Sequence, residues 1–256
     1  MTTLDLVALP YAGAHMDPFH GLRTAAEAAV PGLASMTVTY PGHGRRISET
    51  LAPSVERMAA DALTQLLEHR SRTGSTAPVV LLGYSMGALV AYELAHLLSD
   101  LGTPAAELLV MASTPPEHVV GTGLSLTGDD ELLEHCEQYG ILAASSFPDA
   151  ALRRLFLPAL RNDILAVDRY PGPVRGTRPL PTGTRLTVFT GDADPTVSDL
   201  PAWADLVDTA VATRHYAGGH FFLTECREAL WADVTAALAD SARRAGGDPT
   251  CERSAA

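Results

Sequence analysis

The chain contains no lysine, so all 18 of its basic residues are arginine. Acidic residues outnumber them at 30, and the formal net charge over 256 residues is −12. A surface this acidic repels the phosphate backbone of nucleic acids and the anionic surface of membranes. The composition therefore argues against both as partners, and the absence of lysine is more typical of a GC-rich genome than of a binding function.

Cysteine is also scarce, and long apolar runs are missing. The three cysteines, Cys136, Cys226 and Cys251, are far apart and odd in number, so they fit neither a disulfide framework nor a zinc-ligand pattern. No apolar run approaches the length of a membrane span, and residues 1–9 lack the basic start and apolar core of a signal peptide. We expect a cytoplasmic protein with reduced thiols and without a metal or other cofactor.

What the sequence does contain is a serine flanked by glycines. The motif G-Y-S-M-G at 83–87 follows the apolar run Pro78–Leu82 and precedes a helical pattern from Ala88 to Leu98. In this context Ser85 lies at a sharp strand-to-helix turn, which lifts its hydroxyl clear of the sheet. The backbone N–H of Met86 would then lie at a helix N-terminus, where it can stabilise negative charge on a substrate oxygen. The pattern predicts a nucleophile elbow.

A serine hydroxyl is a weak nucleophile until a base removes its proton. Among the nine histidines, His220 has the best context, because two glycines between the strand-like Val211–Tyr216 and His220 allow a tight loop. Such a loop can direct the imidazole back at Ser85. His215 is the nearest rival, but it alternates within the strand and is expected on a sheet face.

The carboxylate that orients the base should follow a strand between the serine and the histidine. The strand-like Leu108–Met111 ends in Ala112 and offers no carboxylate, whereas Arg185–Thr190 runs into G-D-A-D-P. Asp192 and Asp194 both qualify. We favour Asp194, because Asp192 suits a loop-bracing role and a proline fixes the chain just after Asp194.

A second oxyanion donor is expected near the N-terminus. The strand-like Leu4–Leu9 ends in the small-residue loop P-Y-A-G-A at 10–14, which is where hydrolases with such an elbow place that donor. The backbone N–H of Ala12 or Tyr11 should supply it. Loss of one such donor typically lowers the rate by about a hundredfold or more.

Strand-like and helical segments alternate along the chain, which predicts an α/β fold with a mostly parallel, doubly wound sheet, as in the α/β hydrolases. Strands are expected near residues 4–9, 35–40, 78–83, 106–112, 184–190 and 211–216. Helices are expected near 18–29, 54–71, 87–100, 199–207 and 224–243. We expect one domain over residues 1–245 and a disordered tail at 246–256.

The segment at about 115–172 interrupts this alternation. It contains two helical patterns, Asp129–Tyr139 and Ala151–Asp168, and Pro158 suggests a break or restart within the second. An insertion at this place, before the strand that carries the acid, is where α/β hydrolases have a lid.

Six motifs occur along the chain, and their order and spacing are more specific than any one of them. They are L-P-Y-A-G at 9–13, Y-P-G-H-G-R at 40–45, G-Y-S-M-G-A at 83–88, L-F-L-P-A-L-R-N-D at 155–163, G-D-A-D-P at 191–195 and G-G-H-F-F at 218–222. Over roughly residues 4–240 the chain resembles the type II thioesterases, the free-standing editing hydrolases of polyketide and nonribosomal peptide assembly lines. The resemblance implies that Ser85 is the nucleophile, Asp194 the acid and His220 the base.

Three details bear on what this resemblance implies. Ala112 supplies no acid at the strand end where product-releasing thioesterase domains commonly carry one, which favours the editing branch. Tyr84 stands where the family usually has a histidine, and A-H-M-D at 14–17 stands where the family usually has a second glycine and small residues after the first motif. Both departures border the acyl entrance, where substrate preference is set.

The expected function is that of a serine thioesterase that removes acyl groups from phosphopantetheine-bearing carriers and so edits stalled or misprimed chains. Its partner would be an acyl carrier protein or a peptidyl carrier domain. The oxyanion hole would consist of Met86 and Ala12, and candidates for the acyl channel are Tyr11, Tyr84, Leu155 and Phe156. The alternatives are a carboxylesterase for small esters, a product-releasing thioesterase of the same pathway type, and a non-catalytic relative.

Docking of a carrier raises a question of charge. Acyl carrier proteins are generally acidic, so binding to this acidic chain needs an arginine patch or an apolar contact. The candidates are Arg45, Arg46, Arg153 and Arg154.

Overall fold

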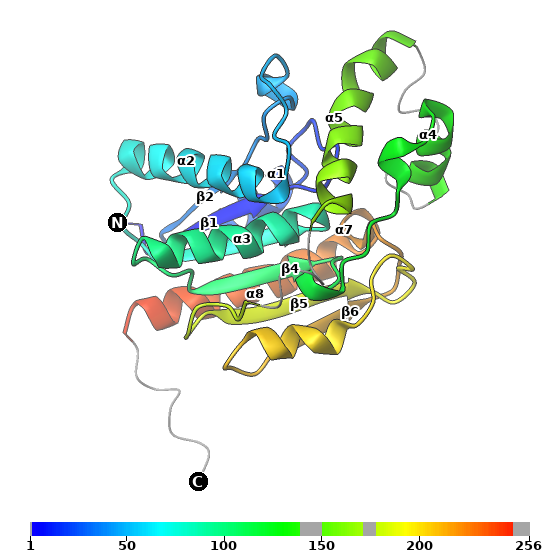
Figure 1. The fold of residues 1–256 in the computed structure, drawn as a ribbon. Coiled ribbons are helices and arrows are strands. Elements are labelled where there is room, and N and C mark those ends of the chain that lie inside the picture. The colour runs from blue at the N-terminus through cyan, green and yellow to red at the C-terminus, as the bar shows by residue number, and fades with distance from the viewer. Residues whose placement is uncertain (1, 139–149, 171–177, 248–256) are drawn as a thin grey trace.

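The computed structural model describes residues 2–138, 150–170 and 178–247, and within these ranges the chain forms a sheet of six strands (Figure 1). The strands are β1 Leu4–Leu9, β2 Leu33–Thr37, β3 Val79–Tyr84, β4 Glu107–Met111, β5 Arg185–Gly191 and β6 Ala212–Tyr216. Their order is β2-β1-β3-β4-β5-β6, and every neighbouring pair is parallel. The expected parallel α/β sheet is confirmed.

Burial explains why the central strands could be read from the sequence. β1, β3 and β4 are buried along their whole length. Strands covered on both faces appear as continuous apolar runs, as in Val79–Leu82. Val79 and Leu81 join the apolar core on one face of the sheet, whereas Val80 and Leu82 join the core on the other.

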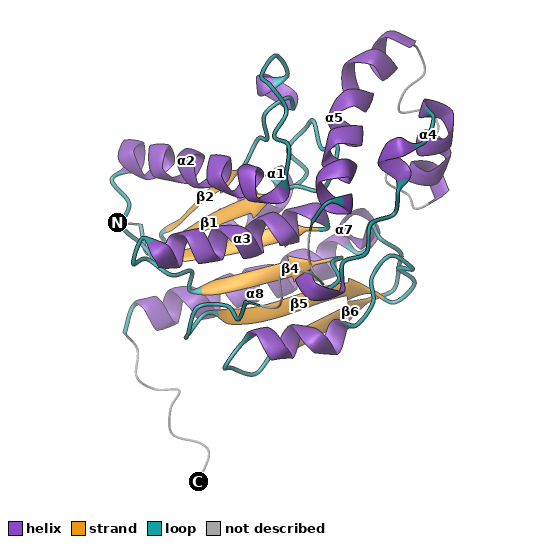
Figure 2. Ribbon diagram, viewed as in Figure 1, coloured by secondary structure: helices purple, strands orange, loops and turns teal. Residues whose placement is uncertain are grey.

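Helices cover both faces of the sheet (Figure 2). α2 (Val55–Thr73) and α3 (Met86–Asp100) pack on one face, and α1 (His20–Ala29) and α8 (Arg227–Ala245) on the other. The short helix α7 (Phe222–Glu225) precedes α8. Short 3₁₀ helices occur at Gly44–Arg46, Pro116–His118, Leu124–Leu126 and Leu200–Leu206. No helix of the described ranges is both long and apolar enough to cross a membrane.

Two further helices, α4 (Asp129–Gln138) and α5 (Ala150–Asp168), lie outside the sheet layers, beyond the carboxyl ends of the strands (Figure 1). They pack on each other through an apolar cluster of Leu132, Leu133, Cys136, Leu157 and Leu160. The expected break at Pro158 is wrong, because α5 continues through it. Pro158 is exposed, so water can satisfy the carbonyl oxygen that loses its N–H partner.

The domain boundaries remain a proposal. Helix α8 ends at Ala245, and residues 248–256 of the expected tail lie outside the described ranges. Residues 139–149, between α4 and α5, also lie outside them.

Candidate active site

Ser85 lies at the turn between β3 and α3. Its backbone φ of 54° and ψ of −120° are unusual for a residue with a side chain. A Cβ on Gly83 would lie 2.3 Å from the carbonyl oxygen of Gly87, and a Cβ on Gly87 would lie 2.0 Å from that of Leu9. Only hydrogen fits at these two positions, so the flanking glycines permit the close packing that holds Ser85 at the edge of the sheet.

His220 connects Ser85 to Asp194. Its Nε2 lies 3.0 Å from Ser85 Oγ, and its Nδ1 lies 2.7 Å from Asp194 Oδ2. A carboxylate can only accept, so Nδ1 carries the ring proton and Nε2 is left to accept the serine proton. The His220 side chain is 7% exposed and that of Asp194 is 0% exposed. The loops after β3, β5 and β6 thus bring together the three residues singled out from the sequence.

Asp194 receives further hydrogen bonds from Thr196, a residue that the sequence analysis missed. The Thr196 hydroxyl and backbone N–H donate to Asp194 Oδ1 at 2.6 and 2.9 Å, and the hydroxyl oxygen lies 2.9 Å from His220 Nδ1. Burial alone would raise the pKa of Asp194, but the hydrogen bond and charge of His220 and the Thr196 donors lower it. Asp194 is therefore held as a carboxylate. A threonine two positions after an aspartate, the spacing of an Asx turn, could have identified this contact.

His215 and Asp192, the alternatives to His220 and Asp194, pair with each other. His215 Nδ1 lies 3.0 Å from Asp192 Oδ1, and both side chains are 59% exposed. Water therefore screens this pair, while Asp194 makes the buried contact with His220. Within the described residues, no three His, Cys, Asp or Glu side chains form a group that could hold a metal ion.

Ser85 opens into a pocket of about 200 Å³ that also contains Ala12 and Met86. Met86 is the first residue of α3, so its N–H has no acceptor within the helix and lies at the positive end of the helix dipole. Ala12 lines the pocket and Tyr11 does not. Of the two residues considered for the second oxyanion donor, Ala12 is therefore the better placed.

Tyr84 and Tyr11 are not among the lining residues, which corrects the expectation that they border an acyl channel. Tyr84 is fully buried, and its hydroxyl donates to the backbone carbonyl oxygen of His220. Side chains alternate along β3, so Tyr84 points to the same face as Val80 and Leu82, toward α1 and α8. Tyr11 packs against it with ring centroids 5.9 Å apart, and burial raises the pKa of Tyr11.

Helix α5 lines the pocket through Ile164 and Val167, whereas Leu155 and Phe156, the candidates from the sequence, are not among its lining residues. Leu155 is 49% exposed, and Phe156 packs on His15 with ring centroids 4.3 Å apart. Ile164 lies roughly two turns farther along the helix than Phe156. The other large apolar residues of the pocket are Leu89, Val119, Val120 and Leu124.

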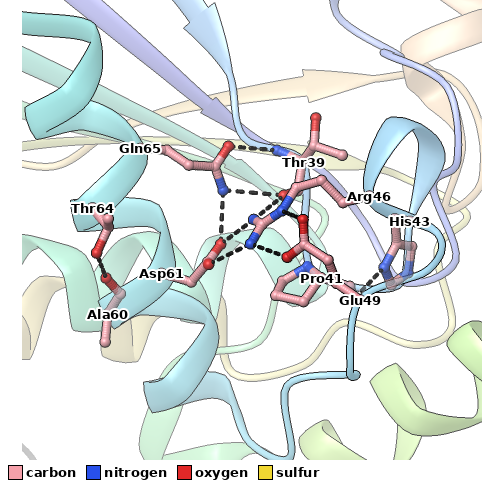
Figure 3. A network of polar contacts seen from close by, with 9 residues as sticks. All are labelled: Thr39, Pro41, His43, Arg46, Glu49, Ala60, Asp61, Thr64 and Gln65. Atoms are coloured by element: carbon pink, nitrogen blue, oxygen red, sulfur yellow. Dashed lines mark hydrogen bonds and ion pairs between the residues drawn. The ribbon is translucent and has the colours of Figure 1, made fainter.

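The candidate docking arginines differ in their surroundings, and Figure 3 shows those of Arg46. Arg46 is engaged in the fold, because its guanidinium pairs with Asp61 and with Glu49, each at distances down to 2.6 Å. Arg153 pairs with an aspartate of α4 at 3.0 Å. The exposed members of the set are Arg45 and Arg154.

Two solved structures resemble this chain over most of its length. The RedJ thioesterase of the prodiginine pathway in Streptomyces coelicolor is 32% identical, with a TM-score of 0.79, over 92% of this chain and 85% of that one. BorB, the type II thioesterase of the borrelidin biosynthetic cluster, is 30% identical, with a TM-score of 0.78, over 93% of each chain. The α/β-hydrolase fold and the resemblance to type II thioesterases are thereby confirmed.

Sequence comparison agrees. The probable cadicidin biosynthesis thioesterase of Streptomyces griseus is 31% identical over 235 residues, which cover 91% of this chain and 62% of that relative. This chain therefore spans less than two thirds of the relative's length. The family model of the thioesterase domain matches residues 5–238. Because this match takes in most of its length, the chain belongs to the thioesterase family.

Proposed function

We propose that this chain is a serine thioesterase that hydrolyses acyl groups from phosphopantetheine-bearing carrier proteins, as a cytoplasmic editing enzyme of polyketide or nonribosomal peptide biosynthesis. The observation that carries the proposal is the hydrogen-bonded series Ser85, His220 and Asp194, whose first two members line a largely apolar pocket, in a chain of the thioesterase family. The pathway names of RedJ and BorB support the same substrate class.

In this mechanism Ser85 Oγ attacks the thioester carbonyl carbon while His220 Nε2 takes the hydroxyl proton. The N–H groups of Met86 and Ala12 stabilise the oxygen that becomes negative. The intermediate then collapses, the C–S bond breaks, and the imidazolium returns its proton to the leaving thiolate. Water, deprotonated by the same histidine, attacks the acyl ester and releases a carboxylic acid and free Ser85. Asp194 holds the required tautomer and stabilises the imidazolium.

The size of the pocket favours editing of short acyl groups over release of a finished product. Its volume of about 200 Å³ lies below the range of roughly 300–1,000 Å³ that is usual for small-molecule sites. Ala112 follows directly after β4 and lines this pocket, so the position where releasing domains commonly carry their acid holds an uncharged side chain here. A small cavity whose lining is mostly apolar, with Thr122 and Asp168 among its polar residues, suits short apolar acyl groups better than a long polar chain.

A comparison of acyl donors tests the proposal. We expect kcat/KM for short acyl groups to be higher on a carrier protein than on coenzyme A, and higher on either than on simple oxygen esters of the same acids. The Ser85→Ala variant gives the background rate. Faster turnover of simple oxygen esters than of every carrier thioester would contradict the proposal and favour a small-ester carboxylesterase. Preference for a full-length product on its carrier would favour a releasing enzyme.

A further inference from the structure

Asp163, on the lid helix α5, contacts the loop that carries the proposed oxyanion donor Ala12. Its Oδ2 accepts a 2.9 Å hydrogen bond from the backbone N–H of Gly13, the residue directly after Ala12. The same oxygen lies 2.9 Å from His43 Nε2. The Asp163 side chain is 0% exposed, and its Oδ1 is buried without a hydrogen-bond partner in the described ranges. Burial of a partly unpaired carboxylate is costly, which points to a role other than packing.

The geometry makes His43 a cation. Its Nδ1 lies 3.1 Å from the carbonyl oxygen of Pro41 and its Nε2 faces Asp163, so both ring nitrogens face acceptors and both must donate (Figure 3 shows the first contact). Burial alone would lower the pKa of His43, but the hydrogen bond and charge of Asp163 outweigh it and raise the pKa. The neighbouring ring of His15 stacks on His43, and burial together with the charge of His43 lowers the pKa of His15. His15 therefore remains neutral beside the ion pair.

Helix α5 rests on two separate segments of the core. The first is the loop at 10–14, which carries Ala12. A Cβ on Gly13 of this loop would lie 2.8 Å from Leu160 Cδ1, so the helix is packed directly on the loop. One residue before Asp163, the Asn162 side chain donates to the carbonyl oxygen of Ala52 at 2.8 Å. Asn162 thus ties the same helix to the segment before α2, and Asp163 ties it to the loop of Ala12.

We infer that Asp163 is a positioning residue that, paired with His43, fixes Gly13 and thereby directs the N–H of Ala12 at the reacting oxygen. The inference rests on the proposed function, because it takes Ala12 as an oxyanion donor. An oxyanion donor acts because its N–H points in a fixed direction. If the loop that carries it is free to move, the rate of the chemical step falls although substrate can still bind. Helix α5 then has two roles, since it also lines the acyl pocket through Ile164 and Val167.

The Asp163→Asn substitution is diagnostic because it keeps the size of the side chain and removes its charge. A neutral His43 that still donates from Nδ1 to Pro41 has only a lone pair at Nε2, which must accept from the introduced amide NH₂ group. The amide nitrogen then occupies the place of Oδ2 and meets the Gly13 N–H, donor against donor. The opposite rotamer keeps the acceptor, but His43 is then either a buried imidazolium without a counter-charge or a neutral Nε2–H tautomer whose Nδ1 lone pair faces the Pro41 carbonyl oxygen. Each arrangement loses either the hydrogen bond to Gly13 or one that supports it through His43, so the hold on Gly13 is weakened.

The experiment compares three variants: Asp163→Asn, the matched control Asn162→Ala on the same helix, and the double variant Asp163→Asn/His43→Gln. In the double variant the glutamine amide donates in place of the imidazole without charge, so the introduced asparagine can turn its carbonyl oxygen back to Gly13. Kinetics are measured on an oxygen ester and on a carrier thioester. Affinity is measured for an alkyl trifluoromethyl ketone, which forms a tetrahedral oxyanion adduct with a serine, and for a non-hydrolysable thioether analogue.

We expect Asp163→Asn to lower kcat by about tenfold to a hundredfold and to lower the affinity for the trifluoromethyl ketone by a similar factor. KM and the affinity for the thioether analogue should stay within about twofold of the wild-type values. Asn162→Ala should keep kcat within about twofold, and the double variant should recover most of the lost rate. Equal losses in Asp163→Asn and Asn162→Ala would overturn the inference, as would a folded double variant that recovers nothing. If Asp163→Asn does not fold, the kcat of the double variant compared with the wild type still tests the inference.

The two acyl donors keep this test separate from the proposed function. Wild-type activity on oxygen esters without activity on carrier thioesters would contradict the proposed substrate. The ratios between the variants on the ester would still test the positioning role of Asp163.

Discussion

At the residue scale the proposed chemistry depends on one hydroxyl group. Ser85→Ala removes that group from a turn at the sheet edge and leaves no cavity in the core, so we expect hydrolysis to be lost and the fold to be kept. Mass spectrometry of the wild type quenched during turnover should find the acyl group on Ser85 alone. Circular dichroism checks the fold of the variant, and near-normal turnover by it would mean that another residue is the nucleophile.

The two aspartates after β5 differ in what they contact. Asp194→Asn removes the charge beside His220 Nδ1, so we expect kcat to fall by about 10⁴, the size of the loss when the histidine takes the wrong tautomer. Asp192→Asn affects only an exposed pair with His215, and kcat should stay within about twofold. Steady-state kinetics and thermal melts of both variants provide the test. A larger loss of rate from Asp192→Asn would assign the acid to Asp192.

The proposed serine, base and acid could be predicted because each follows a strand at the same edge of a parallel sheet, where local sequence marks the strand and the turn. The contact between Asp163 and His43 could not be predicted in this way. It joins residues 120 positions apart, one on a lid helix and one in a loop, and no local pattern links them. Tyr84 was expected in the acyl channel but lies in the core. The alternation of side chains along β3, which places Tyr84 on the same face as Val80 and Leu82, could have indicated this from the sequence.

At the scale of elements, the sequence predicted the positions of the strands and helices closely. It did not predict which residues of α5 line the pocket. Leu157, Leu160, Ile164 and Val167 follow one another at three- and four-residue spacing and so share one side of α5, yet the first two pack on α4 while Ile164 and Val167 line the pocket. Such spacing identifies a helix with an apolar side but not what each turn of that side meets. The pocket-lining residues of α5 are therefore known only from the structure.

Substitutions on α5 test this assignment. Ile164→Ala enlarges the pocket, so we expect kcat/KM to shift toward longer acyl groups by about fourfold per methylene, which corresponds to about 0.8 kcal/mol of burial. Turnover of the acetyl group should change little, because it makes the fewest contacts with the lid. Leu155→Ala, at an exposed position of the same helix, is the control. Acetyl through octanoyl donors are compared, and an unchanged profile in Ile164→Ala would show that α5 does not hold the acyl chain.

At the scale of the whole molecule, the net charge of −12 governs the approach of a charged partner. For an acidic carrier we expect kcat/KM to rise as NaCl is raised from about 0.01 M to 0.15 M, because the screening length falls from about 30 to 8 Å and repulsion weakens. An uncharged oxygen ester should show no such dependence and serves as the control. A fall in kcat/KM with salt would instead indicate docking on local positive charge, for which exposed Arg45 and Arg154 are the candidates.

The long separation of the proposed nucleophile and base along the chain has a consequence during protein synthesis. Ser85 and His220 are 135 positions apart, and β6, which leads into the His220 loop, is the last strand of the sheet. A nascent chain that has already formed the elbow has no base until β5 and β6 have left the ribosome and joined the sheet. An unfinished or unfolded copy therefore lacks the proposed base, and the proposed hydrolysis can appear only after the His220 loop has taken its place beside the elbow.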